Sequence, residues 1–126
     1  MKLLDKETII RQHEEIGQII FEAACCGDYK THNREGAKLI KIFKMFEKNP
    51  DFAMECIDEL LKSNNVVART NAASYCLALK RNVETGERVL EEISQNPAYR
   101  IFCLNAEMTL KVWREKGELQ LYQKKR

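Results

Sequence analysis

The sequence predicts an all-α fold of about six helices in antiparallel pairs, stacked into a short right-handed superhelix. Apolar residues recur at spacings of three and four, glycine and proline are scarce at five and two residues, and no Asn-Gly or Asp-Gly hairpin signal occurs. With 126 residues and 44% hydrophobic content, the chain is expected to bury one core without metals or disulfides. We therefore predict a single domain over residues 1–126, with frayed ends at 1–4 and 118–126.

The first three predicted helices each have a start or stop signal. The first covers about residues 5–26, and Gly27 ends it as a C-terminal cap. Asp28 caps a second helix that runs to Lys48, and Asn49 with Pro50 opens the third. One apolar stripe marks the first helix, made by Ile9, His13, Ile16, Ile20 and Ala23.

The second half of the chain repeats this pattern. Residues 63–65 break the chain and cap a fourth helix that ends near Lys80, and Asn82 caps a fifth. Asn96 and Pro97 open a sixth helix, which runs to residue 116 and stops at Gly117. Equivalent helix starts recur 32 and 33 residues apart (50 to 82 and 64 to 97), which indicates successive helix pairs of similar size.

The segment Ala68-Arg69-Thr70-Asn71-Ala72-Ala73, followed by Leu77, resembles the second-helix signature of HEAT repeats. The resemblance implies that Ala72 and Ala73 let adjacent helices approach closely and that Arg69 braces the turn of a neighbouring repeat. The sequence departs from the signature in having Ala68 where valine is usual, and asparagine where aspartate often opens the turn.

More broadly, residues 15–119 resemble a family of small bacterial HEAT-like proteins with no assigned function. The matching parts include "ERVLEEIS" at 87–94 and "AEMTLKVWREKGEL" at 106–119. Helical repeats of this size also occur among immunity proteins, which are cytosolic partners that neutralise a toxin from a neighbouring cell. The resemblance implies a binding protein and does not identify its partner.

Five cysteines without a pairing pattern favour a reducing compartment. Four of the five are expected on apolar helix stripes, where a free thiol packs as a small hydrophobic group. The N-terminal residues lack the unbroken apolar run of a signal peptide, and no segment has the about 20 apolar residues of a membrane helix. We therefore expect a soluble cytoplasmic protein that does not associate with membranes.

No set of residues predicts catalysis, a metal site or a cofactor. His13 lies on the apolar stripe of the first helix and is interpreted as a core histidine. His32 and Glu35 supply only two ligands for a metal, so we interpret them as surface residues. Cys25 and Cys26 point about 100° apart on a helix and lack a nearby base, so core packing and a helix end are their expected roles.

A basic stripe on the second helix raises two alternatives. Such a row is expected of phosphate contact, but the net charge is only +2 and the third helix is acidic. We favour a solvated face or a protein contact over nucleic acid. The stripe consists of Arg34, Lys38, Lys41, Lys44 and Lys48.

Trp113 is the single tryptophan, and it is expected to anchor the core at the end of the stack. Partial exposure of its ring would favour a binding role, because tryptophan is enriched at interface hot spots. Together these features predict a non-catalytic protein-binding repeat protein, with a toxin domain as one candidate partner. The helix faces at the two ends of the stack are also natural self-association surfaces, so a homo-oligomer is a further alternative.

Overall fold

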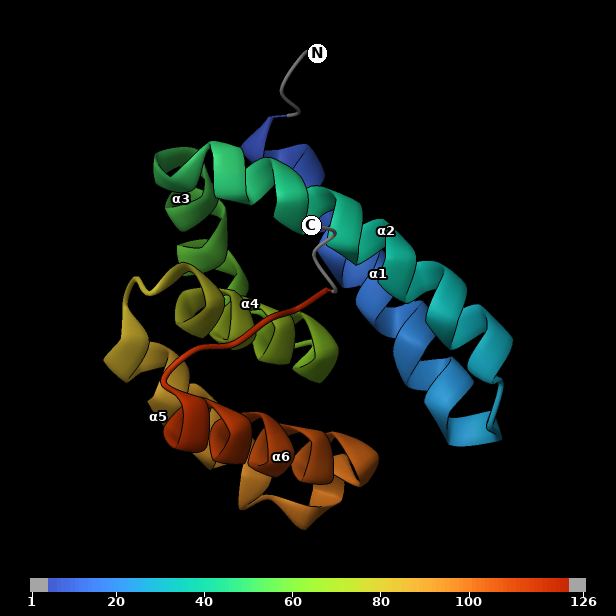
Figure 1. Ribbon diagram of the computed structural model, residues 1–126. Helices are drawn as coiled ribbons and strands as arrows, with labels where there is room; N and C mark the ends of the chain where they lie inside the picture. Colours follow the sequence, from blue (N-terminus) through green and yellow to red (C-terminus); the bar gives the residue numbers. More distant parts are fainter. Residues whose placement is uncertain (1–4, 123–126) are drawn as a thin grey trace.

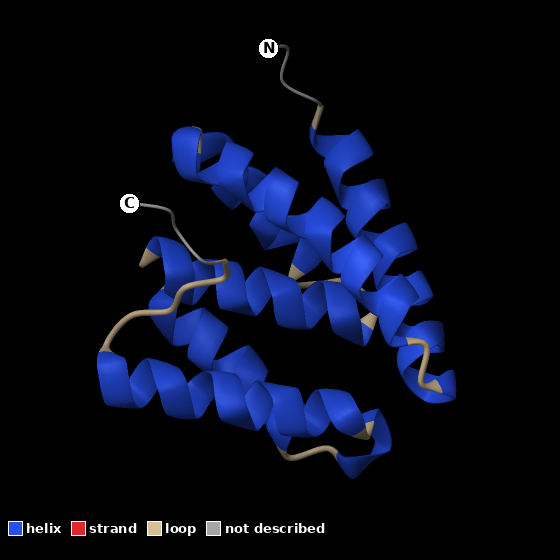
Figure 2. Cartoon of the chain, turned by 45° about the vertical axis from the view of Figure 1, so that its right-hand side comes forward, coloured by secondary structure: helices blue, strands red, loops and turns tan. Residues whose placement is uncertain are grey.

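A computed structural model describes residues 5–122 of the chain, and within this range every regular element is helical (Figures 1 and 2). The predicted all-α fold with six helices is therefore confirmed. None of the described helices is long and apolar enough to span a membrane. The elements are α1 Lys6–Cys26, α2 Tyr29–Lys48, α3 Pro50–Leu60, α4 Val66–Leu79, α5 Val83–Ser94, the 3-10 turn η1 Pro97–Tyr99 and α6 Ile101–Lys116.

Short polar side chains set several helix starts as expected. Asp28 accepts a hydrogen bond from the backbone N–H of Thr31 at 3.1 Å, and Asn65 accepts one from Ala68 at 3.0 Å. Gly27 and Gly117 follow α1 and α6 with φ of 74° and 70°, a left-handed conformation that favours glycine.

Three predicted start signals were wrong in detail. Asn49 does not cap α3, because its side-chain amide instead donates to the carbonyl oxygen of Met45 at 3.0 Å. Asn82 adopts a left-handed conformation with φ of 55° and makes no side-chain cap. Asn96 and Pro97 open only the turn η1, because Arg100, with φ of 55° and ψ of −121°, interrupts the chain before α6 begins.

The helices form three successive pairs, and α4, in the second pair, lies at the centre. In Figure 1, α1 and α2 run side by side, as do α5 and α6, whereas the short α3 lies crosswise to α4. Helix α4 contacts α1, α3, α5 and α6, and nine of its fourteen residues are buried. It is therefore the central helix, and two apolar clusters flank it, one toward α5 and α6 and the other toward α3 and α1.

Small residues allow α5 to approach α4 closely. Ala72 and Ala73 are fully buried, and a β-carbon placed on Gly86 would lie 2.8 Å from the carbonyl oxygen of Ala73. Arg69 extends from α4 to α5, where its Nη2 lies 3.2 Å from Oε1 of Glu92. The small pair and the arginine thus act between the second and third helix pairs.

The C-terminal segment is packed rather than frayed between residues 118 and 122. It leaves α6 and crosses α4 toward α2 (Figure 1), and Leu119, Leu121 and Tyr122 pack against the two apolar clusters. The expected frayed end at 118–126 was therefore wrong for 118–122. Residues 1–4 and 123–126 lie outside the described part.

Candidate functional site

An open groove lies along the second helix of each pair. It has a volume of about 450 Å³ and is lined by residues of α2, α4 and α6, with Ile20 from α1 and Leu121 from the C-terminal segment. Its apolar lining includes Ile20, Phe43, Val67 and Phe102. A groove with an apolar floor and a few polar groups is the usual form of a binding site on a protein surface.

Three asparagines line this groove, one from each of the three helices. Asn33 is the fifth residue of α2, Asn71 the sixth of α4 and Asn105 the fifth of α6. A side-chain amide carries both a donor and an acceptor, as a peptide group does. The amides of the three helices can therefore form hydrogen bonds with main-chain groups of a ligand.

The amide of Asn71 has an unused hydrogen-bond donor. Its Nδ2 atom is buried and has no partner among the described residues, although the residue as a whole is partly exposed. An unpaired buried donor costs about 1–3 kcal/mol. A carbonyl group of a ligand in the groove would satisfy this donor once the amide turned toward the groove.

Part of the chain itself already lies across one end of this surface. Residues 118–122 are non-helical (Figure 2), and Figure 1 shows this segment leaving α6 and crossing α4 toward α2. The ring of Tyr122 lies 6.1 Å from that of Phe43, and its hydroxyl donates to Glu47, which raises the pKa of Tyr122. The surface formed by α2 and α4 therefore holds a non-helical segment of polypeptide.

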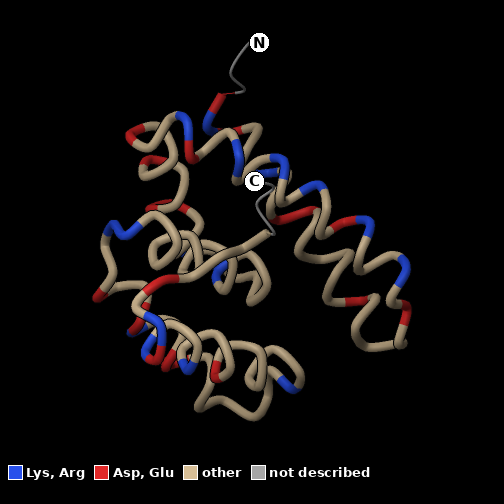
Figure 3. The backbone as a smooth tube through the Cα atoms, in the orientation of Figure 1, with Lys and Arg blue, Asp and Glu red and all other residues tan. Residues whose placement is uncertain are grey.

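All five residues of the basic stripe are exposed. Figure 3 shows Lys and Arg positions recurring along α2. Two of them share one carboxylate, since Glu35 Oε2 lies 3.3 Å from Arg34 Nε and 2.8 Å from Lys38 Nζ. Lys44 Nζ lies 4.8 Å from the centre of the Tyr122 ring. Within residues 5–122, only Lys41 and Lys48 of the stripe engage neither a carboxylate nor an aromatic ring.

The interpretation of Glu35 as a surface residue was wrong. Its side chain is only 1% exposed. It nevertheless lies close to the surface, because only a thin layer of side chains covers it. The hydrogen bond from Lys38, with a smaller contribution from Arg34, holds the pKa of Glu35 below its usual value. Glu35 therefore neutralises part of the stripe, while the partly exposed His32 lines the groove instead of sharing a site with it.

Trp113 is half-buried and packs against the cluster between α4, α5 and α6. It does not line the groove. The structure thus separates Trp113 from the basic stripe, and the two do not form one site.

His13 is fully buried, as expected for a core histidine. Its Nδ1 donates to the carbonyl oxygen of Ile9 at 2.9 Å, so Nε2 of the neutral ring accepts from the Tyr75 hydroxyl at 3.0 Å. Burial lowers the pKa of His13 and raises that of Tyr75. This pair joins α1 to α4 and has a structural role.

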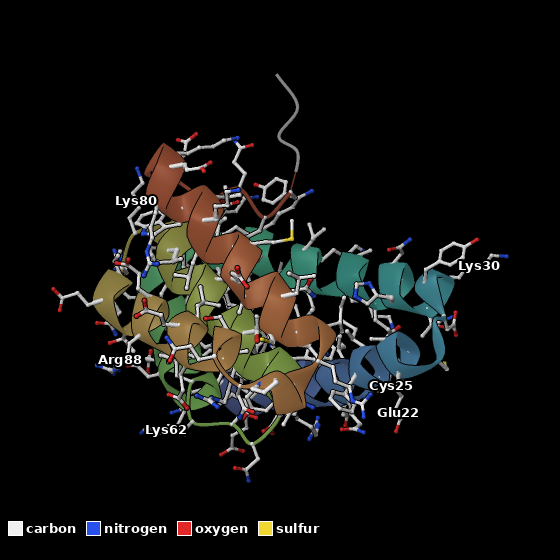
Figure 4. The ribbon with its side chains drawn as sticks, turned by 90° about the horizontal axis from the view of Figure 1, so that it is seen from below. Glu22, Cys25, Lys30, Lys62, Lys80 and Arg88 are labelled. Carbon is white, nitrogen blue, oxygen red and sulfur yellow. The ribbon has the colours of Figure 1, made fainter. Side chains whose placement is uncertain are left out.

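The cysteines divide between core and surface. Cys56 and Cys76 are fully buried, and burial raises the pKa of each thiol to about 11. Cys25 and Cys26 are exposed at the end of α1, so their expected core packing was wrong and only the helix-end position was right. Figure 4 shows Cys25 at the far end of the α1–α2 hairpin, away from α5 and α6.

Within residues 5–122, no group of three or more histidine, cysteine, aspartate or glutamate side chains could hold a metal ion. Comparison of the chain with protein-family models, curated proteins and solved structures finds no match. The groove and its amides are therefore the observations from which a function can be argued.

The three asparagines of the groove were not predicted from the sequence. Asn71 and Asn105 are 34 residues apart, close to the helix-pair period, and each falls near the start of the second helix of its pair. A search for polar residues repeating at this period would have found both. Asn33 escapes that search because the first helix pair is longer.

Proposed function

We propose that the protein is a non-catalytic binding protein whose groove holds an extended segment of a protein partner. The observation that carries this proposal is the row of Asn33, Asn71 and Asn105 along one groove. Each amide can donate to and accept from the partner's main chain, while the apolar floor takes its side chains.

Electrical neutrality of the lining supports a peptide over a charged ligand. No aspartate, glutamate, lysine or arginine is among the described residues that line the groove. Its ionisable side chains are His32 and Tyr75, and the Tyr75 hydroxyl already donates to His13. Main-chain amides are neutral and need no counter-charge. None of the stripe residues lines the groove, and Lys38 and Lys41 border a separate hollow between α1 and α2.

An immunity-type inhibitor is one form of this proposal. A toxin domain that places an extended segment in the groove would be blocked by occlusion. The resemblance to helical-repeat proteins suggests this role. In that case the partner is a toxin that comes from outside the producing cell.

Affinity capture with matched variants tests the proposal. Tagged wild-type protein and an Asn71→Ala/Asn105→Ala variant are exposed to nuclease-treated host lysate and to lysate of neighbouring cells. We expect a stoichiometric protein partner that the wild type retains and the variant loses. Retention of the same partner by the variant would contradict groove binding, and turnover of a substrate that a point mutation abolishes would contradict a non-catalytic role.

Nucleic-acid binding through the basic stripe is the second candidate. The exposure of Lys41 and Lys48 without an ion-pair partner in residues 5–122 favours it, whereas the sharing of Glu35 by Arg34 and Lys38 weakens it. It predicts binding that falls steeply with salt and that Lys41→Glu with Lys44→Glu abolishes. Binding that does not depend on salt would exclude this candidate.

A further inference from the structure

Helix α6 carries a second apolar stripe on its solvent side. Its members are spaced by three and four residues and lie on the face opposite the buried Phe102, Ala106 and Leu110. The stripe consists of Ile101, Leu104, Met108 and Val112, whose exposed fractions are 48%, 49%, 57% and 37%.

The two ends of the helix stack differ in polarity. Helix α6 closes the last pair with this apolar stripe, whereas the exposed residues of α1 in the first pair are mostly charged, including Arg11, Glu14 and Glu15. The outer face of a terminal repeat is usually polar, because nothing further covers it. The α6 end therefore has the composition of a covered surface.

In a second copy of the chain, the surface that can cover this stripe is the same stripe on its own α6. Head-to-tail stacking would place the apolar stripe against the charged face of α1 and would strip those charges of water. Pairing of α6 with α6 puts apolar against apolar. It also closes the assembly at two subunits, as a two-fold interface does.

Charge complementarity fixes the direction of the pairing. Arg100 precedes the stripe and Glu115 follows it, and both are exposed without an ion pair in residues 5–122. Antiparallel pairing about a two-fold axis between Leu104 and Met108 places Arg100 of one copy opposite Val112 of the other, within one helical turn of Glu115, and it does so twice. Parallel pairing would instead bring like charges together.

We infer that the protein forms a homodimer through antiparallel packing of α6 against α6, centred between Leu104 and Met108. The stripe exposes a few hundred Å² of apolar surface at most, below the about 800 Å² per partner of a standard interface. The dimer is accordingly weak and depends on concentration. The groove and the dimer contact share helix α6, because Asn105 and Thr109 line the groove. Partner binding and dimerisation are therefore measured in separate experiments.

Sedimentation equilibrium of the full chain tests the inference, with reductant present because Cys25 and Cys26 are exposed. Between about 10 µM and about 1 mM we expect a monomer–dimer equilibrium, the range in which a small interface associates. Met108→Glu should weaken association at least about tenfold, because it places a charge at the apolar centre. Ile19→Glu, at an exposed apolar residue of α1, is the matched control and should leave association unchanged.

Charge exchange tests the antiparallel register. Arg100→Glu and Glu115→Arg should each weaken the dimer about two- to fivefold, as expected for exposed ion pairs, and the double variant should restore it. A monomer at every concentration, growth beyond the dimer, or disruption by Ile19→Glu would overturn the inference. Failure of the double variant to restore association would overturn the antiparallel arrangement. Circular dichroism of each variant confirms that it folds, so that loss of association is assigned to the interface.

Discussion

The imidazole Nε2 of His13 accepts a hydrogen bond from the Tyr75 hydroxyl, with 3.0 Å between the two atoms, in the centre of the core. The His13 ring also stacks on Phe46 at 6.1 Å. Three helices, α1, α2 and α4, therefore meet at one neutral polar pair.

Protonation of His13 should destabilise the fold. Burial lowers the pKa of His13 in the folded state from its ordinary value of 6.5, so below that value the unfolded chain binds more protons. The contribution of His13 to the free energy of unfolding should thus be constant above about pH 7 and should fall as the pH decreases from about 6.5 toward 5. Urea unfolding across this window measures it. His13→Gln removes the titrating group while keeping polar contacts, and an equally steep fall in that variant would contradict the assignment.

The same substitution at two glycines should have opposite effects. A β-carbon at Gly86 would lie 2.8 Å from the Ala73 carbonyl oxygen and 2.9 Å from the Cys76 β-carbon, whereas one at Gly36 meets nothing within 4 Å. We expect Gly86→Ala to cost about 1–3 kcal/mol through overpacking, and Gly36→Ala to stabilise by about 0.5–1 kcal/mol through helix propensity. Denaturant unfolding of both variants measures the difference. A stabilised Gly86→Ala variant would show that α5 does not approach α4 as closely as described.

Removal of the Asn71 amide should leave the fold more stable while it weakens binding. The buried Nδ2 has no partner in the described part, so Asn71→Ala should raise the free energy of unfolding by roughly 1 kcal/mol. Asn105→Ala, at an exposed position, should change it by less than about 0.5 kcal/mol. Thermal and urea unfolding give both values. A loss of more than about 1 kcal/mol in Asn71→Ala would mean that the amide serves the fold and not a ligand.

Tyr122 should stabilise the end of α2 from the C-terminal segment. Its ring packs on Phe43 and lies under the Lys44 ammonium group. We expect Tyr122→Ala to cost about 1 kcal/mol and to speed amide exchange in α2 near Phe43. Hydrogen exchange followed by mass spectrometry measures this, with the α5 peptides as an internal control. Unchanged exchange in α2 would show that the segment does not hold that helix.

The helix content and most boundaries could be predicted because each follows from local signals. Asp28, Asn65, Gly27 and Gly117 act on their own neighbouring backbone, and the structure shows each of them where the sequence placed it. The predicted start of α6 was wrong because Pro97 favours an α-helix and a 3-10 turn alike. The positive φ of Arg100, which separates the turn from α6, has no sequence signal.

The surface features could not be predicted from local patterns. Glu35 is covered because α1 packs beside it and because Arg34 and Lys38 close over its carboxylate, which depends on how two helices meet. The C-terminal segment has little regular pattern, and its packing depends on a partner surface some 75 residues earlier, at Glu47. The groove likewise exists only when α2, α4 and α6 are placed together.

Selection of peptides from a random linear library tests the central claim, that the asparagine-lined groove binds an extended segment. Peptides are selected on the wild-type protein. Calorimetry then compares their affinity for the wild type with their affinity for an Asn33→Ala/Asn71→Ala/Asn105→Ala variant. We predict affinity at least about tenfold higher for the wild type, from the loss of several main-chain hydrogen bonds, together with shifts of the three side-chain amide signals in NMR spectra. Equal affinity for both proteins, or shifts confined to another surface, would contradict the claim.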